Sequence, residues 1–556
     1  MDSSRLLLRG TPVVPGAGYG PAVRPMPRPD PAVAMSAAPS DPETELDRLE
    51  RAVTAVADRL NERAGHVSGA AADVLRTGAV MADDPGLRSV AKKAIREGRS
   101  ACQALWSAAA EFTSAFEAAG GLMAERVTDL EDIRDRVAAE LLGLPEPGVP
   151  VPEAPSVLLA ADLAPADAAL LDPELITAIA VRLGGPTSHT AIIARQLGIP
   201  CVVGVHRLDE TADDHLILVD GTAGTVTVDP EPQSARDRVA EAREQAATAA
   251  AWRGEGATSD GHGVDLLANV QDGAGARAAA QGVAVGVGLM RTELAFMASA
   301  TEPSSDHQAH VYGDVLRAFP DAKVIIRTLD AGSDKPLPFI EFEDESNPAL
   351  GVRGLRIAAD DPGILDRQLD AIAAAARAVG AAVDPWVMAP MVATVAEARF
   401  FAERARARGL VPGVMIEVPA AALLAESILA EVDFVSIGTN DLSQYTMAAD
   451  RLSPALASLC DPWQPAVLAL IDRVAQAGRA TGKRVGVCGE AAADPLLACV
   501  LVGMGVSSLS AAPIALPAVG ARLAGATLAD CERAAAAALA TTDSREAREA
   551  AAGALA

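Results

Sequence analysis

The second half of the chain repeats one pattern, in which a strand-like apolar run is followed by a stretch with helical periodicity. Eight such runs occur within roughly 250 residues, a density that is typical of a closed barrel of alternating strands and helices. The sequence therefore predicts a (β/α)8 barrel of the TIM type for this part of the chain. The predicted strands lie at 265–270, 286–291, 323–329, 386–391, 413–418, 433–438, 484–488 and 506–511.

Several polar side chains follow these predicted strands at the point where each strand ends. Because parallel barrel strands all end at the same face, we expect these side chains to meet at one mouth of the barrel, where barrel enzymes build their active sites. Packing of an apolar core would not place polar residues at these positions. The residues are Arg291, Arg327, Glu417, Asn440, Asp441 and Cys488.

Residues 36–143 carry the periodicity of amphipathic helices. Apolar residues recur there at spacings of three and four, which places them on one face of a helix. One such stripe consists of Leu46, Leu49, Val53, Val56 and Leu60. The segment therefore predicts a helical subdomain with a bundle-type core.

Residues 1–35 and 144–230 carry strand patterns on either side of this helical segment. One or two strands are expected near the N-terminus, before a proline-rich linker, and they have no obvious partners of their own. We expect them to complete one sheet with the later strands, so that the helical segment is an insertion in an α/β domain. The later elements are strands at 156–160, 176–181 and 200–205, a hairpin at 215–229 and a helix at 188–197; a charged connecting helix at 231–255 then leads to the barrel domain, residues 256–556.

The composition excludes two classes of partner. With 47 basic and 74 acidic residues the formal net charge is −27, which repels nucleic acid and anionic membrane surfaces. Residues 495–521 are uncharged and long enough to span a bilayer, but glycine, serine and proline interrupt them, so we expect a buried strand plus a loop and no membrane insertion.

The six cysteines lie far apart without a CxxC pair, which indicates reduced thiols and a cytoplasmic protein.

A glycine-rich turn leads into the predicted helix at 188–197 and carries a histidine. The sequence at 184–195 is GGPTSHTAIIAR, in which Thr187 or Ser188 can cap the helix and His189 falls in its first turn. Free N–H groups and the helix dipole favour an anion at that position, so a phosphoryl group on His189 would be stabilised there. A lone histidine beside a cap is nevertheless most commonly a surface or capping residue.

The string around His189 resembles the phosphohistidine motif of the phosphoenolpyruvate-utilising enzymes, and the resemblance continues into the predicted barrel. Together with the order of the domains it covers nearly the whole chain, and it implies a phosphohistidine at His189 and a phosphoenolpyruvate site in the barrel. The barrel strings that resemble the substrate-binding sequences of the family are GLMRTE at 288–293, RTLDAGSDK at 327–335, NPALGVR at 347–353, MIEVP at 415–419, SIGTNDLSQY at 436–445, DR at 450–451 and CGE at 488–490.

The order of the segments separates the branches of this family. The dikinase and synthase branches carry a large ATP-binding domain ahead of the phosphohistidine domain, whereas only about 150 residues precede that region here, without a glycine-rich phosphate loop. The arrangement is similar to that of the Enzyme I branch, phosphoenolpyruvate-protein phosphotransferases, whose helical subdomain docks the phosphocarrier protein HPr. This resemblance implies that 36–143 binds HPr and that the barrel forms a homodimer. A dikinase-like or synthase-like enzyme and a catalytically silent protein that senses phosphoenolpyruvate are the alternatives.

The polar residues at the strand ends fit the ligands that the resemblance implies. Phosphoenolpyruvate carries a carboxylate and a phosphate, which guanidinium groups bind in bidentate fashion. Glu417 and Asp441 supply hard oxygens suited to a Mg²⁺ ion that also touches the substrate, and a salt bridge at the rim of the barrel is the alternative interpretation of these acids. The candidate substrate-binding residues are Arg291, Arg327, Arg353, Asn440 and Arg451.

Cys488 is the least expected candidate at the predicted barrel mouth. A cysteine is usually a small buried hydrophobe, but by resemblance Cys488 donates the proton that turns pyruvate enolate into pyruvate.

Two positions depart from the family pattern: many relatives have Arg where Pro186 stands and Gly where Ser333 stands. Pro186 suits the entry to a helix, so we expect the fold to persist without the phosphate contact of that arginine.

Overall fold

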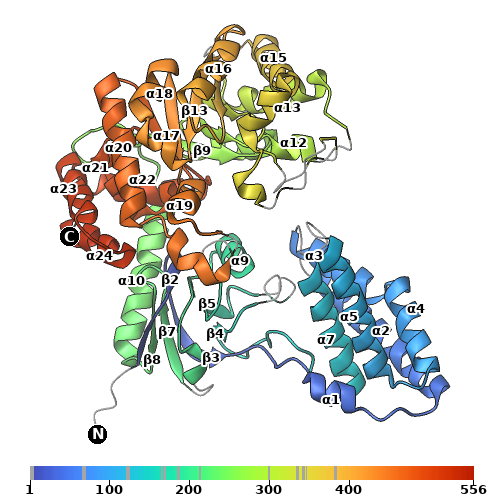
Figure 1. The fold of residues 1–556 in the computed structure, drawn as a ribbon. Helices are drawn as coiled ribbons and strands as arrows, with labels where there is room; N and C mark the ends of the chain where they lie inside the picture. Colours follow the sequence, from blue (N-terminus) through green and yellow to red (C-terminus); the bar gives the residue numbers. More distant parts are fainter. Residues whose placement is uncertain are drawn as a thin grey trace. The chain divides into compact units, whose positions relative to one another are not determined.

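The structure of the chain is a computed structural model (Figure 1). The chain divides into two compact units, residues 1–243 with 452–458 and residues 244–451 with 459–556. The described residues are 6–65, 70–119, 126–163, 167, 171–184, 188–211, 215–297, 301–332, 337, 339, 340, 345, 347–380, 385–451 and 453–555.

The second unit contains a closed barrel of parallel strands, as the sequence predicts. All eight predicted strands are present among the described residues, and the last pairs with the first, Ser508 with Asp265, to close the ring. The strands are β9 (Asp265–Val270), β10 (Val287–Met290), β11 (Val324–Arg327), β12 (Trp386–Ala389), β13 (Val411–Ile416), β14 (Phe434–Gly438), β15 (Arg484–Cys488) and β16 (Ser508–Ala511).

Helices follow the barrel strands and cover their outer faces. They are α11 (Gly273–Ala280), α12 (Glu293–Met297), α13 (Ser305–Ala318), α14 (Ile357–Asp360), α15 (Pro362–Val379), α16 (Val395–Arg406), α17 (Pro419–Leu423), α18 (Ala425–Glu431), α19 (Thr439–Met447), α20 (Pro465–Thr481), α21 (Pro495–Met504), α22 (Leu516–Ala524), α23 (Leu528–Leu539) and α24 (Ser544–Ala554). Short 3-10 helices lie at Pro348–Leu350, Gly354–Arg356 and Glu490–Ala493.

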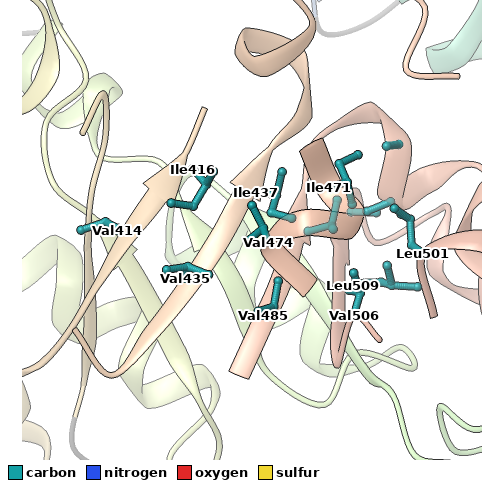
Figure 2. Packing of buried hydrophobic residues seen from close by; sticks show 14 of the residues in the cluster. Val414, Ile416, Val435, Ile437, Ile471, Val474, Val485, Leu501, Val506 and Leu509 are labelled. Carbon is teal, nitrogen blue, oxygen red and sulfur yellow. The ribbon is translucent and has the colours of Figure 1, made fainter. Parts of the chain in front are cut away.

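Alternation along the strands separates the two faces of the barrel wall. Val414 and Ile416 of β13 belong to the outer core, which also contains Ile471 of α20, and Figure 2 shows such contacts between strands and helices. Met415, which lies between Val414 and Ile416 in the strand, belongs instead to an inner cluster that also contains Cys488. Because strand side chains alternate with a period of two, Cys488 points into the barrel while Val487 faces the helices.

The uncharged stretch 495–521 folds differently from the buried strand plus loop that the sequence suggests. It forms α21, then β16, then α22. Asp494 caps α21 by accepting from the N–H groups of Leu496 and Leu497, with Pro495 at the first helical position. Nearly every residue of α21 is buried, so no polar stripe marks it as helical. In the described part of the chain, no helix has the length and apolar character needed to cross a membrane.

The first unit contains one sheet in which the N-terminal strands pair with strands that follow the helical segment, as predicted. The strand order is β1-β8-β7-β3-β4-β5-β6-β2. Three N-terminal strands form rather than the one or two expected. Gly10 separates β1, which pairs with β8, from β2, which pairs with β6, and Gly16, whose φ of +121° favours glycine, lies between β2 and β3. The strands are β1 (Leu7–Arg9), β2 (Thr11–Val14), β3 (Ala17–Val23), β4 (Ser156–Ala160), β5 (Ile176–Val181), β6 (Cys201–Val203), β7 (Leu216–Asp220) and β8 (Thr225–Val228).

Helices fill the segment between β3 and β4, and the predicted stripe on the longest of them is buried apart from half-buried Leu46. The first helix lies in the expected proline-rich linker, because Asp30 caps it and Pro31 fits its first position. The helices are α1 (Pro31–Ser36), α2 (Pro42–Ala64), α3 (Ala70–Ala82), α4 (Pro85–Arg96), α5 (Ala101–Ala119) and α7 (Val127–Leu142); α9 (His189–Leu197) and α10 (Pro232–Ala251) follow later in the chain.

A buried arginine joins the last helix of this segment to the chain that follows it. Arg136 of α7 is 1% exposed, and its guanidinium contacts three carboxylates. Nε lies 2.7 Å from Asp132, and the two terminal nitrogens lie 2.6 Å from Glu146 and 2.5 Å from Asp167. Glu146 belongs to the stretch that leads from α7 toward β4, so the cluster connects the helical segment to the sheet.

Replacement of this arginine is expected to destabilise the protein strongly. Arg136→Met leaves Asp132 and Asp167 buried without a counter-charge, which costs about 3–5 kcal/mol. Urea unfolding followed by circular dichroism measures the loss. Arg59→Met is the matched control, because Arg59 also pairs with Glu146 but is one-third exposed, so its loss should stay below about 1 kcal/mol. Equal losses in the two variants would contradict the assigned role of Arg136.

Candidate active site at the barrel mouth

Cys488 is the last residue of β15 and lies inside the barrel. It is 2% exposed, and the hydroxyl of Ser436 on neighbouring β14 donates a hydrogen bond to its Sγ over 3.0 Å. Burial raises the pKa of the Cys488 thiol to about 11, an effect that the Ser436 hydrogen bond opposes. The thiol is therefore protonated at neutral pH and holds a proton at the carboxyl end of the strand.

Glu417 directly follows β13 and is completely buried. Its Oε1 accepts a hydrogen bond from the N–H of Met391 over 2.6 Å, and Met391 holds a φ of +61°, a strained conformation for a residue other than glycine. Its Oε2 has no hydrogen-bond partner in the described part of the chain. Burial, followed by the nearby charges of Asp441 and Asp330, raises the pKa of Glu417 to about 7.

Asp441 lies in the first turn of α19, directly after β14. Its two oxygens accept from two of the candidate arginines, Oδ1 from Arg353 over 3.1 Å and Oδ2 from Arg451 over 3.3 Å. Together with the unpartnered oxygen of Glu417, this carboxylate offers the hard donors that a divalent cation takes. The described residues contain no group of three or more histidine, cysteine, aspartate or glutamate side chains that could hold a metal, so a cation here would also need oxygens from the substrate.

Two candidate arginines are buried and share one carboxylate. Arg353 is 1% exposed and binds Asp330 in bidentate fashion, with both N···O distances at 2.9 Å. Arg327 lies 3.1 Å from the same aspartate and 2.7 Å from Glu293. These contacts fix the planes of both guanidinium groups. Asp330 and Glu293 were not selected from the sequence, although both lie in family-like strings beside the arginines that they hold.

The remaining candidates lie around the same mouth. Arg291 follows β10 and is exposed, and within the described part of the chain its guanidinium makes no hydrogen bond or ion pair. Its positive charge, like that of Arg327, lowers the pKa of Cys488 slightly, which places it near the thiol. The structure therefore brings all the barrel candidates together at the carboxyl ends of the strands.

Asn440 connects the ends of β14 and β15. Its side-chain oxygen accepts from the N–H of Glu490 over 3.1 Å. Gly489 makes this close approach possible, because a Cβ there would lie 2.5 Å from Oγ1 of Thr439 and the φ of +143° disfavours other residues. The amide group of Asn440 is thus held beside Asp441, in keeping with its place among the candidate substrate-binding residues.

His189 begins α9 in the first unit, as predicted. Ser188 caps the helix by accepting from the N–H of Ala191 over 3.3 Å, which selects Ser188 between the two candidate caps. Gly198 ends the helix, so the backbone around His189 is a short, well-defined helix. Pro186 and Ser333, the two departures from the family pattern, lie outside the described residues, and so does Thr187.

Three family models match the chain. They are the N-terminal segment of phosphoenolpyruvate-utilising enzymes over residues 9–126, their mobile domain over 152–224 and their phosphoenolpyruvate-binding domain over 245–528. The chain belongs to the phosphoenolpyruvate-utilising enzyme family. The mobile-domain match contains His189, and the phosphoenolpyruvate-binding match contains all the candidate residues of the barrel.

Similar proteins place the chain in one branch of this family. It is 50% identical to the phosphoenolpyruvate-protein phosphotransferase of Streptomyces coelicolor over 92% of each chain, and 38% identical to that of Haloferax volcanii over 85% of each. A solution structure of Enzyme I (nEIt) covers 43% of this chain and 98% of its own, at 27% identity and a TM-score of 0.38. The 50% identity to the Streptomyces coelicolor protein over nearly the whole chain makes this chain a member of the Enzyme I branch, the phosphoenolpyruvate-protein phosphotransferases.

The buried carboxyl of Glu417 predicts a pH dependence of stability in the metal-free protein. Between about pH 4.5 and pH 7 the folded protein keeps a proton that the unfolded chain has released, so the free energy of unfolding falls as the pH rises through this window. Glu417→Gln removes this fall and should make the protein more stable at pH 7.5, by an amount on the order of 1–3 kcal/mol.

Thermal unfolding in chelator across this pH range measures the effect. Glu403→Gln, which changes an exposed carboxyl on α16, is the control and should leave the profile as it is in the unchanged protein. A Glu417→Gln profile that still falls between pH 4.5 and pH 7 would show that another group carries the pH dependence.

Proposed function

We propose that the chain transfers the phosphoryl group of phosphoenolpyruvate first to His189 and then to a histidine of the phosphocarrier protein HPr, the first step of sugar uptake by the phosphotransferase system. The observation that carries the proposal is the convergence of four arginines, two acids and a buried thiol at one barrel mouth, in a chain 50% identical to a phosphoenolpyruvate-protein phosphotransferase.

The arginines suit a substrate with two anionic groups. Arg327 and Arg353 are held in fixed orientations by Asp330, so little conformational freedom is lost when a ligand binds them. Arg291 is unpaired within the described residues and exposed, and it is therefore available to a phosphate or carboxylate. Arg451, which is partly exposed and pairs with Asp441, completes the set.

Charge balance supports a requirement for Mg²⁺. The four arginines face four carboxylates, Asp330, Glu293, Glu417 and Asp441, so the protein groups alone roughly cancel. Phosphoenolpyruvate brings roughly −2.5 to −3 charges at neutral pH. Glu417 and Asp441 would hold a Mg²⁺ ion, which would neutralise charge on the oxygens of the substrate. The unpartnered Oε2 of Glu417 is the observation that favours this assignment.

The proton that the reaction needs lies on Cys488. When the P–O bond of phosphoenolpyruvate breaks, its electron pair stays on the enolate oxygen and a P–N bond forms to the imidazole of His189. The methylene carbon of the enolate then takes the proton of the Cys488 thiol and gives pyruvate, and solvent returns a proton to the thiolate. A thiol with a pKa of about 11 keeps its proton until so basic a carbon is present.

The remaining assignments follow the family. We propose that the sheet domain, 1–35 with 144–230, carries the phosphohistidine, that 36–143 docks HPr, and that 231–255 links both to the barrel domain, 256–556. His189 belongs to a different unit from the barrel site and would have to serve both that site and HPr, so we further propose that the sheet domain moves as a unit between the two. We further propose a homodimer through the barrel and a cytoplasmic location, which the six free cysteines support.

Substitution of the histidine tests the proposed function directly. With ³²P-labelled phosphoenolpyruvate and Mg²⁺, the unchanged protein should acquire an acid-labile label and pass it to added HPr. His189→Ala should acquire no acid-labile label, because the imidazole that accepts the phosphoryl group is gone, yet it should still bind phosphoenolpyruvate in the barrel. His206→Ala is the control and should label normally. Undiminished labelling of His189→Ala would remove His189 from its role, and an unchanged protein without label would favour a silent sensor.

Replacement of the thiol separates catalysis from packing. Cys488→Ser is nearly isosteric but a far weaker acid, so pyruvate formation should slow by roughly tenfold or more while affinity for phosphoenolpyruvate changes little. Cys499→Ser, at a fully buried thiol on α21, is the control and should lower the melting temperature without slowing turnover. Turnover and melting temperature are measured on the same preparations. Unchanged turnover in Cys488→Ser would return this residue to a packing role.

A further inference from the structure

A chain of buried polar side chains runs through the helical layer beside the barrel mouth. Gln308 and Tyr312 on α13, Gln368 on α15 and Thr292 after β10 are each at most 1% exposed. The surrounding apolar layer consists mainly of alanine, leucine, valine and isoleucine. Apolar residues of similar size would fill this space, so the polar groups need another explanation.

The hydrogen bonds of Gln368 have only one consistent direction. The backbone N–H of Leu329 can only donate, and it lies 3.0 Å from Oε1 of Gln368, which fixes the orientation of the amide. The amide nitrogen then donates to Oγ1 of Thr292 over 3.3 Å and to the hydroxyl of Tyr312 over 3.1 Å. All the polar atoms of this glutamine are therefore used.

The hydroxyls of Thr292 and Tyr312 each accept from Gln368 and donate to a further oxygen. Thr292 donates to the backbone carbonyl of Arg327 over 3.0 Å. Tyr312 donates to Gln308 over 3.1 Å, and Gln308 in turn donates to the carbonyl of Pro303 over 2.9 Å. Burial raises the pKa of Tyr312, so its hydroxyl keeps the proton that it donates to Gln308 in this network. Each buried group in the chain has a partner, which makes the arrangement rigid.

The network joins the ends of two strands that carry candidate substrate-binding residues. Thr292 lies between Arg291 and Glu293, and Leu329 lies two residues after Arg327. Gln368 accepts from the loop after β11 and donates to the loop after β10, so it fixes the two loops relative to each other. The same loops are also joined directly, because Thr292 donates to the Arg327 carbonyl and Glu293 accepts from the Arg327 side chain and from the N–H of Asp330.

We propose that Gln368 is a positioning residue for phosphoenolpyruvate binding: from the outer helix α15 it sets the relative placement of Arg291 and Arg327, which contact the substrate. The inference rests on the proposed function, because it takes these arginines as substrate ligands. A leucine at 368 would leave the Leu329 N–H without a partner and would remove the donor that the Thr292 and Tyr312 hydroxyls accept from, so the two loops would move apart or admit water. A shift of this kind misplaces both guanidinium groups without touching either of them.

The test compares two glutamines of the same network in a His189→Ala background, in which phosphoenolpyruvate binds without turnover. Gln368→Leu should weaken phosphoenolpyruvate binding by about tenfold, measured by calorimetry with Mg²⁺ present. Gln308→Leu removes two buried hydrogen bonds at the far end of the network and should lower the melting temperature comparably, while the Kd stays within about twofold. Equal weakening by both variants, or a Gln368→Leu protein that binds normally, would overturn the proposal.

A second variant keeps the test decisive if Gln368→Leu does not fold. Thr292→Val removes the hydroxyl between Gln368 and the Arg327 carbonyl and should also weaken binding about tenfold. Where both single variants fold, the double variant should weaken binding about tenfold rather than about a hundredfold, because both break one connection. Additive effects, or normal binding by Thr292→Val, would overturn the proposal. A His189→Ala protein that does not bind phosphoenolpyruvate at all would instead contradict the proposed function.

Discussion

Closure of a barrel from parallel strands is the constraint on which the site depends. Every strand ends at the same mouth, so Arg291 and Cys488 meet there although they lie far apart in the sequence. Alternation along each strand then decides which side chains face inward. A shift of one residue in β15 would turn Cys488 toward the helices and bring Val487 inside, so the register of the strand fixes the chemistry of the mouth.

Inside this frame, carboxylates hold the arginines in place. Asp330 contacts both Arg327 and Arg353, and Glu293 contacts Arg327 a second time, so the guanidinium planes are set before any ligand arrives. The same pairing neutralises much of the positive charge of the arginines before a substrate binds. Burial, followed by the nearby charges of Asp441 and Asp330, raises the pKa of Glu417 toward neutrality.

The sequence predicts what depends on local periodicity and misses what depends on distant contacts. Strands such as β13 and β15 were predictable because apolar runs bounded by turns mark them. Helix α21 was not predictable, because most of its residues are buried and no polar stripe marks one face. Helix α1 was missed because it begins in a proline-rich stretch, although Pro31 suits the first position of a helix. Asp330 and Gln368 gain their meaning from partners many residues away, so only the folded chain singles them out.

The two halves of the proposed reaction call for opposite kinds of site. Phosphoenolpyruvate must be bound by groups from several strands, and networks such as that of Gln368 make the barrel mouth rigid enough to hold them. The phosphohistidine must instead serve two places, the barrel and a carrier protein. Its stabilising environment is correspondingly local, because the N-terminal turn of α9 and its Ser188 cap are contiguous with His189 in the chain and move with it. A histidine dependent on side chains from distant elements would lose its anion-stabilising surroundings each time it left them.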